Sequence, residues 1–179
     1  MSGEPPAPQS ATAATTGARR HVAAIGAIAV VGYVLDQLTK ALALAHLDPS
    51  NPPSFLGGFL TLRLIRNPGA AFSLGSGVTV VFTIIAIAAL VGLLFVALPR
   101  VRGWVPSLVV AFLLAGVAGN LTDRLVREPG PFVGHVVDFI SLPHFAIFNV
   151  ADMFITSATV LLVAQALFMK ESPTGTQAE

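Results

Sequence analysis

The sequence predicts an all-α membrane protein with four transmembrane helices and a small extracytoplasmic β-sheet. Hydrophobic residues make up 54% of the 179 residues and charged residues only 11%, whereas a soluble domain has roughly 25% charged residues. The apolar residues gather in stretches of about 20, the length needed to cross hydrocarbon. The net charge is +1 and the sequence has no block of like charges, which argues against nucleic-acid binding. The absence of cysteine excludes disulfides and thiolate chemistry.

The first transmembrane helix is predicted over residues 22–45. Its apolar run is interrupted by Asp36 and Lys40, which stand four positions apart and so share one helix face, where they can neutralise each other. A cleavable signal peptide is the alternative interpretation, because an arginine pair precedes the apolar run and small residues follow it at 41–45. The charged residues between the apolar run and that small-residue site argue against cleavage.

The other three transmembrane helices are predicted over 78–98, 104–121 and 153–169. Each is apolar over a length that can span a bilayer, and the first of the three contains no charge. Residues 1–21 and 171–179 are predicted to be disordered cytoplasmic tails, and 22–170 to form one membrane domain. An excess of basic residues assigns the cytoplasmic side: Arg19, Arg20, Arg100, Arg102 and Lys170.

The two longer connections, 46–77 and 122–147, are then extracytoplasmic. In the first, leucines at 60, 62 and 64 alternate with Thr61 and Arg63, the period of a half-buried strand. The sequence Asn67-Pro68-Gly69 predicts a turn after it. We therefore expect a small sheet lying on the outer surface of the membrane.

Polar residues cluster at the outer ends of the predicted helices. Asn120 precedes Asp123 by three positions and Arg124 by four, so a hydrogen-bonded unit is expected within that helix. Charge beside hydrocarbon is costly and usually functional. The residues predicted to converge at this depth, with Asp138 in the loop between the last two helices, are Asp36, Lys40, Asn120, Asp123, Arg124, Asn149 and Asp152.

Each of these residues also has a purely structural interpretation. Asn149 could cap the last helix, with Asp152 completing a box-like arrangement at the third helical position. Asp123 and Arg124 could form an ordinary interfacial ion pair, and Asp138 could be a solvated loop acid. No metal or cofactor is predicted, because no metal-ligand spacing is present among His21, His46, His135 and His144.

Two close carboxylates can hydrolyse an amide without a metal or a covalent intermediate. They cannot both stay ionised at a few ångströms' separation, so they share one proton and titrate as a pair. The ionised carboxylate takes a proton from water, and the protonated one donates to the carbonyl oxygen. Serine-enzyme motifs such as GxSxG are absent, and so is GxGD, which marks another class of intramembrane aspartyl enzyme.

Five motifs in order make the chain resemble lipoprotein signal peptidase, also called signal peptidase II. The resemblance covers residues 22 to 169. The motifs are Asp36-Gln37-Leu38-Thr39-Lys40, Arg66-Asn67-Pro68-Gly69-Ala70-Ala71-Phe72, Gly119-Asn120-Leu121-Thr122-Asp123-Arg124, Val136-Val137-Asp138-Phe139 and Phe148-Asn149-Val150-Ala151-Asp152.

The resemblance implies a four-helix aspartyl endopeptidase of the bacterial inner membrane whose active site faces the extracytoplasmic side. Such enzymes cleave prolipoproteins before a cysteine that carries diacylglyceryl, act among membrane lipids, and are blocked by globomycin-type inhibitors. Asp138 and Asp152 match the catalytic dyad, and Asp36 and Lys40 a supporting pair. The positions that match the substrate pocket are Asn67, Gly69, Asn120, Asp123, Arg124 and Asn149.

One stretch departs from the family's pattern. Residues 127–132 lengthen the link between Asp123 and Asp138, which leaves the course of that loop open. Two other classes are a small proton-coupled transporter and a structural membrane subunit. The transporter is disfavoured because no internal repeat or pair of broken midplane helices is found, and the structural subunit because it would need no particular pair of aspartates.

Overall fold

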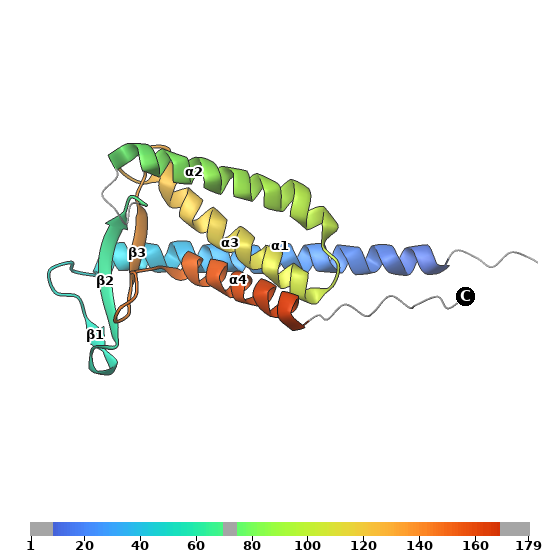
Figure 1. Ribbon diagram of the computed structural model, residues 1–179, viewed down its shortest axis with the longest axis horizontal. Coiled ribbons are helices and arrows are strands. Elements are labelled where there is room, and N and C mark those ends of the chain that lie inside the picture. Colours follow the sequence, from blue (N-terminus) through green and yellow to red (C-terminus); the bar gives the residue numbers. More distant parts are fainter. Residues whose placement is uncertain (1–8, 70–74, 169–179) are drawn as a thin grey trace, which may run out of the picture.

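Four long helices and a three-stranded antiparallel sheet make up the computed structural model, which describes residues 9–69 and 75–168. Side chains are described over 20–69 and 78–168. In Figure 1 the helices lie side by side and the sheet stands across one end of them. The helices are α1 (Gln9–His46), α2 (Gly75–Gly92), α3 (Trp104–Val126) and α4 (Val150–Phe168).

Four segments are long and apolar enough to cross a membrane: Arg20–His46, Val78–Arg100, Trp104–Val126 and Val150–Phe168. They confirm the four predicted helices. Helix α2 continues through a π-helical turn, η2 (Leu93–Ala97), and a 3-10 turn, η3 (Leu98–Arg100), where Pro99 ends the regular hydrogen bonding.

Helix α1 begins at Gln9, well before the predicted span. Residues 9–21, which the sequence predicts as part of a disordered tail, are helical and continue α1, although the Thr, Ser and Gly residues among them lower the helix propensity of this stretch. Residues 1–8 and 169–179, the remainder of the two predicted tails, lie outside the described residues.

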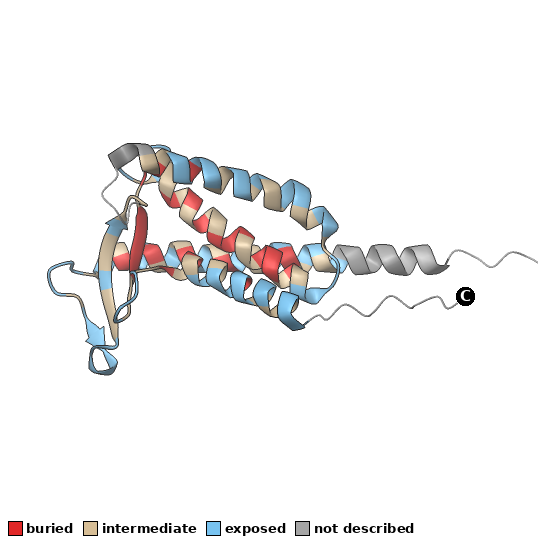
Figure 2. Cartoon of the chain, in the orientation of Figure 1, coloured by how far each residue is buried: buried red, intermediate tan, exposed pale blue. Residues whose placement is uncertain are grey.

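Helix α3 is the central helix of the bundle. Figure 2 shows buried positions running along its length, whereas α2 and α4 are largely exposed on the surface that would contact lipid. Close packing against α4 depends on glycine: a Cβ at Gly116 would lie 2.5 Å from the Ala151 carbonyl oxygen and 2.6 Å from Ile155 Cγ1. A second glycine, Gly119, leaves room for the Asp36 carboxylate in the same way.

The sheet has the order β1-β2-β3, with both pairings antiparallel. Its strands are β1 (Ser54–Phe55), β2 (Leu60–Asn67) and β3 (Val136–Ser141), and a short 3-10 turn, η1 (Leu56–Gly58), links the first two. The predicted strand at 60–64 is confirmed as β2. A register irregularity between Leu62 and Ile65 breaks the strict alternation that the sequence suggested.

Strand β3 corrects one expectation. Asp138 was predicted in a loop but lies in the middle of β3, where it pairs with Ile65 of β2. The neighbouring Val137 and Phe139 pack against Ala43 at the outer end of α1, and this small core fastens the sheet to the helices. Asp138 is thereby held at the junction of sheet and bundle.

Candidate active site

Asp138 and Asp152 reach the same site from two different elements. Asp138 lies in β3 and is 1% exposed, so it is not the solvated loop acid of the structural interpretation. Asp152 is in the first turn of α4 and is half-buried. The two carboxylates accept hydrogen bonds from one residue, Asn149, and the predicted convergence of these two acids is confirmed.

Asn149 joins the carboxylates while capping α4. Its side-chain Nδ2 donates to Asp138 Oδ1 at 2.6 Å, and its backbone N–H donates to Asp152 Oδ2 at 3.2 Å. The Asp152 backbone N–H returns a bond to Asn149 Oδ1 at 3.0 Å. This reciprocal pair is the capping arrangement expected from the sequence. The structural and functional interpretations of Asn149 therefore hold together, because the cap itself fixes the position of Asp152.

Asn120 supplies the second amide of the site. Its Nδ2 donates to Asp152 Oδ1 at 2.7 Å, and its Oδ1 accepts bonds from Lys40 Nζ at 2.9 Å and Asn149 Nδ2 at 3.1 Å. The predicted hydrogen bonds of Asn120 to Asp123 and Arg124 are not formed. Asn120 instead turns toward α1 and α4, where its partners lie on other elements.

A buried ion network lies beside the two amides. Lys40 Nζ is 2.9 Å from Asp36 Oδ2 and 2.8 Å from Asp123 Oδ2, and all three side chains are 0% exposed. The predicted pairing of Asp36 with Lys40 is confirmed. Asp123 takes Arg127 as its second cation, so the interpretation of Asp123 and Arg124 as an ion pair is wrong. One ammonium between two carboxylates offsets part of the cost of burying them.

Arg124 faces the other way and holds the turn after β2. Its Nη1 is 3.5 Å from the Pro68 carbonyl oxygen, and its guanidinium lies 5.7 Å from the centre of the Phe82 ring. Within the predicted turn, the Gly69 N–H donates to Asn67 Oδ1 at 2.8 Å. Gly69 has φ +89°, and a Cβ there would lie 3.0 Å from an Arg124 nitrogen, so this position requires glycine.

Asn67 brings the turn into contact with Asp138. It stands two positions beyond Ile65, the partner of Asp138 in the ladder, so Asn67 and Asp138 are diagonal neighbours on one face. Asn67 Nδ2 donates to Asp138 Oδ2 at 2.8 Å. Residues 70–74, which complete the second sequence motif, lie outside the described residues.

The Asp138 carboxylate is perturbed by its surroundings. The pKa of Asp138 is raised from 3.8 to about 6: burial is the main cause and the negative charge of Asp152 adds to it, whereas hydrogen bonds from Asn67 and Asn149 oppose the shift. A carboxyl group with this pKa can exchange a proton close to neutral pH, which is the property required of a general acid or base.

An apolar cavity opens beside Asp152. Its volume is about 370 Å³, and it is lined chiefly by apolar side chains of α4 and of the β3–α4 connection. The lining residues are Leu142, Phe145, Phe148, Asp152, Met153, Thr156 and Ser157. A hydrophobic chain lying in this cavity would run past the Asp152 carboxylate. Among the residues that the structure describes, no group of three or more His, Asp or Glu side chains is placed to hold a metal ion.

Sequence reasoning missed several supporting residues. Gln37 Nε2 donates to Asp36 Oδ2 at 3.0 Å and to the Gly119 carbonyl oxygen at 3.1 Å. Thr79 Oγ1 donates to the Pro68 carbonyl oxygen at 2.7 Å and so ties α2 to the turn. From the sequence, Arg127 is placed only in a lengthened loop. Its spacing of four from Asp123 was an available signal for their ion pair.

Four membrane-length helices with two carboxylates held together at one end fit the class of membrane aspartic peptidases. The family model described as Signal peptidase (SPase) II matches residues 28–168. The chain therefore belongs to the signal peptidase II family, whose members cleave signal peptides from prolipoproteins.

Individual relatives agree with this assignment. The lipoprotein signal peptidase of Leifsonia xyli is 39% identical over 169 residues, covering 90% of this chain and 78% of the relative. That of Streptomyces coelicolor is 41% identical over 162 residues, with coverage of 90% and 78%. The solved structure of a bacterial membrane enzyme superposes with a TM-score of 0.73 at 29% identity, covering 83% of this chain and 95% of that one.

Proposed function

We propose that Asp138 and Asp152 are the catalytic dyad of this signal peptidase and that they cleave prolipoproteins before a diacylglyceryl-modified cysteine. The observation that carries the proposal is the bridging role of Asn149, which donates to both carboxylates. Two different N–H groups of this one residue hold the carboxylates beside each other, which is the placement that sharing one proton requires. The raised pKa of Asp138 supports proton exchange at the same place.

The proposed reaction needs one proton on the pair. The ionised carboxylate removes a proton from water, the resulting hydroxide adds to the scissile carbonyl carbon, and the protonated carboxylate donates to the carbonyl oxygen. Asn120 and Asn149 keep the carboxylates in position through these transfers, because each bonds to the dyad and to the other. Collapse of the tetrahedral adduct then breaks the C–N bond. The new amino terminus takes up the proton that the first carboxylate removed from water, and a hydroxyl proton of the adduct returns to the second carboxylate, so the pair again holds one proton.

The cavity beside Asp152 supports a lipidated and hydrophobic substrate. Its lining is largely apolar, and Met153 and Phe145 at its border are 49% and 66% exposed. We assign the remaining positions of the pocket to Asn67, Gly69, Asp123 and Arg124. Asn67 and Asp123 hold neighbours by hydrogen bonds, and Arg124 braces the turn. Globomycin-type inhibitors are expected to compete for the same pocket.

The proposed site lies on the outer side of the bacterial inner membrane. Arg100 and Arg102 lie between α2 and α3, at the end of the bundle opposite the sheet, and assign that end to the cytoplasm. The membrane lipids then surround α1 to α4, and the four-helix domain extends over 22–170 as proposed from the sequence.

A cleavage assay with purified protein tests the proposal. A diacylglyceryl-modified prolipoprotein in detergent should be shortened by the wild-type chain and left intact by Asp138→Asn and by Asp152→Asn. Glu128→Gln, which removes an exposed carboxylate from the α3–β3 connection, is the matched control and should retain activity. Full activity in either aspartate variant would contradict the dyad, and activity only on substrate without lipid would contradict the substrate class.

A further inference from the structure

The hairpin formed by β1, η1 and β2 carries exposed apolar side chains at its tip. Phe55, Leu56 and Phe59 are 48%, 77% and 58% exposed. Residues 49–62 contain no charged residue. Large apolar side chains that are grouped and exposed mark a surface that contacts another apolar phase.

The two faces of this hairpin differ in polarity. Phe55 pairs with Leu60, so both project to one face, and Leu62 shares that face by the strand period of two. On the opposite face Ser54 pairs with Thr61, and their hydroxyl oxygens are 3.1 Å apart. The hairpin is therefore an amphipathic ribbon, apolar on the Leu62 face and polar on the Thr61 face.

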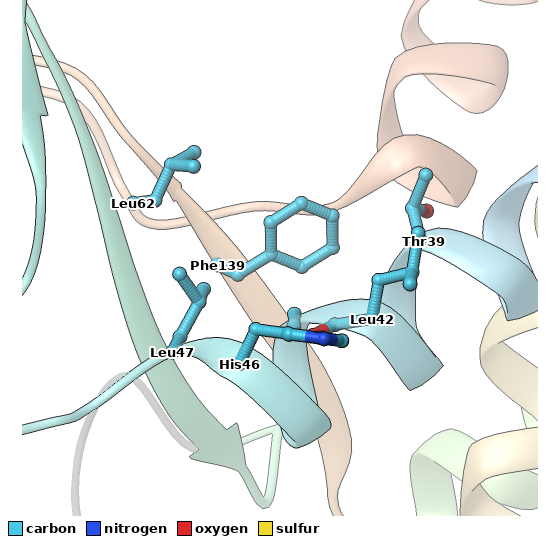
Figure 3. A pocket seen from close by; sticks show the side chains of 7 residues that line it. Thr39, Leu42, His46, Leu47, Leu62 and Phe139 are labelled. Carbon is cyan, nitrogen blue, oxygen red and sulfur yellow. The ribbon is translucent and has the colours of Figure 1, made fainter.

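The apolar face is the one directed at the membrane. Figure 3 shows Leu62 and Phe139 projecting over an apolar groove whose other wall is the outer end of α1, with Leu42 and His46. The groove has a volume of about 420 Å³. Leu42 is 49% exposed on a membrane-spanning helix and so contacts lipid. The lipid-facing surface of α1 thus continues through the groove onto the hairpin's apolar face.

The backbone of the tip holds these side chains outward. Leu56, Gly57 and Gly58 have φ values of +53°, +65° and +95°, a left-handed run that is uncommon for a residue such as leucine. Nothing lies within 4 Å of a Cβ built at either glycine, so these glycines serve the turn and not close packing. A strained conformation at an exposed leucine indicates that its placement has a use.

We propose that this hairpin docks into the outer leaflet of the membrane, with Phe55, Leu56 and Phe59 among the lipid acyl chains near the headgroups. In Figure 1 the hairpin extends sideways beyond α4 at the end of the bundle that carries the sheet, which is the level of the membrane surface. Because the segment is uncharged, the attachment rests on burial of apolar surface and does not need anionic lipid. Phenylalanine and leucine are among the side chains that segments lying in the interface bury at the boundary of headgroups and acyl chains.

Quenching by brominated lipid tests the proposal. Trp104 is the single tryptophan, so a Trp104→Phe background is free of tryptophan emission, and Leu56→Trp in this background reports on the tip alone. The protein is reconstituted in phosphatidylcholine vesicles with or without bromine on the acyl chains. The matched control is Asn51→Trp, an exposed polar position in the loop before the same hairpin. The native chain, whose Trp104 begins a spanning helix, gives the reference for interfacial quenching.

The expected result is at least a twofold loss of Leu56→Trp emission in brominated vesicles and almost none for Asn51→Trp, at any ionic strength. Equal responses of the two probes, or strong quenching of Leu56→Trp by aqueous iodide, would overturn the proposal. A response that appears only when prolipoprotein is added would assign the tip to substrate instead of lipid. Phe59→Trp is a second probe should Leu56→Trp fail to fold. The measurement does not depend on turnover, so it stands even if the proposed cleavage fails.

Discussion

Removal of Lys40 tests the buried ion network most directly. In the structure one ammonium group neutralises two carboxylates, Asp36 and Asp123, at 2.9 and 2.8 Å. Truncating one partner of a buried pair costs about 3–5 kcal/mol, because the other partner is left as an uncompensated charge. Lys40→Ala should therefore lower the midpoint of thermal unfolding by roughly 6–20 °C, taking about 2–4 °C per kcal/mol for a chain of this size.

Neutralising Asp36 and neutralising Asp123 should restore different amounts of stability to Lys40→Ala. Without Lys40, Asp123 still has Arg127 as a cationic partner. Asp36 retains only uncharged donors among the described residues, Gln37 Nε2 at 3.0 Å and the Ala151 N–H at 2.8 Å. Adding Asp36→Asn to Lys40→Ala should therefore recover more stability than adding Asp123→Asn.

Thermal unfolding in detergent, followed by Trp104 fluorescence and by helical circular dichroism, measures all of these variants. Arg63→Ala removes a cation from the exposed side of β2 and is the control, with an expected change within about 0.5 kcal/mol. Strictly additive losses of stability would refute the reasoning, because they would mean that Lys40 does not interact with the carboxylates. Equal recovery from the two neutralising changes would also refute it, because it would mean that Arg127 does not compensate the charge of Asp123. Cleavage is measured separately, since Lys40 also bonds Asn120.

Three further predictions concern pH, packing and topology. Because burial raises the pKa of Asp138 to about 6 from 3.8, the folded state gains about 3 kcal/mol from this proton below pH ~4 and loses it as pH rises through about 6. The unfolding midpoint of Asp138→Asn minus that of the wild-type chain should hence increase between these pH values and then level; a flat difference would contradict the shift. Gly116→Ala should cost about 1–3 kcal/mol by overpacking, whereas Gly92→Ala, with nothing within 4 Å of the added Cβ, should be neutral or stabilising in the same unfolding assay. A reporter fused after residue 168 should report cytoplasm and one inserted at Asn51 the outer side, and the reverse pattern would put the site on the wrong side of the membrane.

The membrane class and the convergence of the site could be predicted because they depend on local signals. Hydropathy over about 20 residues locates a span without knowledge of its neighbours. The box of Asn149 and Asp152 is likewise local, since a cap and its third helical residue are always near in space. The family motifs then added the positions of Asp138 and Asn67, which no local rule would have joined.

The remaining parts of the site depend on partners that are distant in the sequence. The strand character of Asp138 is set by pairing with Ile65, and a six-residue strand outside a span gives little periodic signal by itself. The partners of Asp123 were predicted from its nearest charge, Arg124. Tertiary packing decided otherwise, because α1 brings Lys40 against α3 while Arg124 points to the turn at Pro68.

The ion network also determines which way the Asn120 amide faces. An ammonium can only donate, so Lys40 requires the oxygen of Asn120, not its nitrogen, on the α1 side. The same oxygen accepts from Asn149, and the Asn120 Nδ2 is left to donate to Asp152 at 2.7 Å. An amide flip would set two donors against one another and leave the carboxylate facing an oxygen. The charge buried in α1 thereby orients the group that holds Asp152, which is why stability and cleavage are expected to respond to Lys40 together.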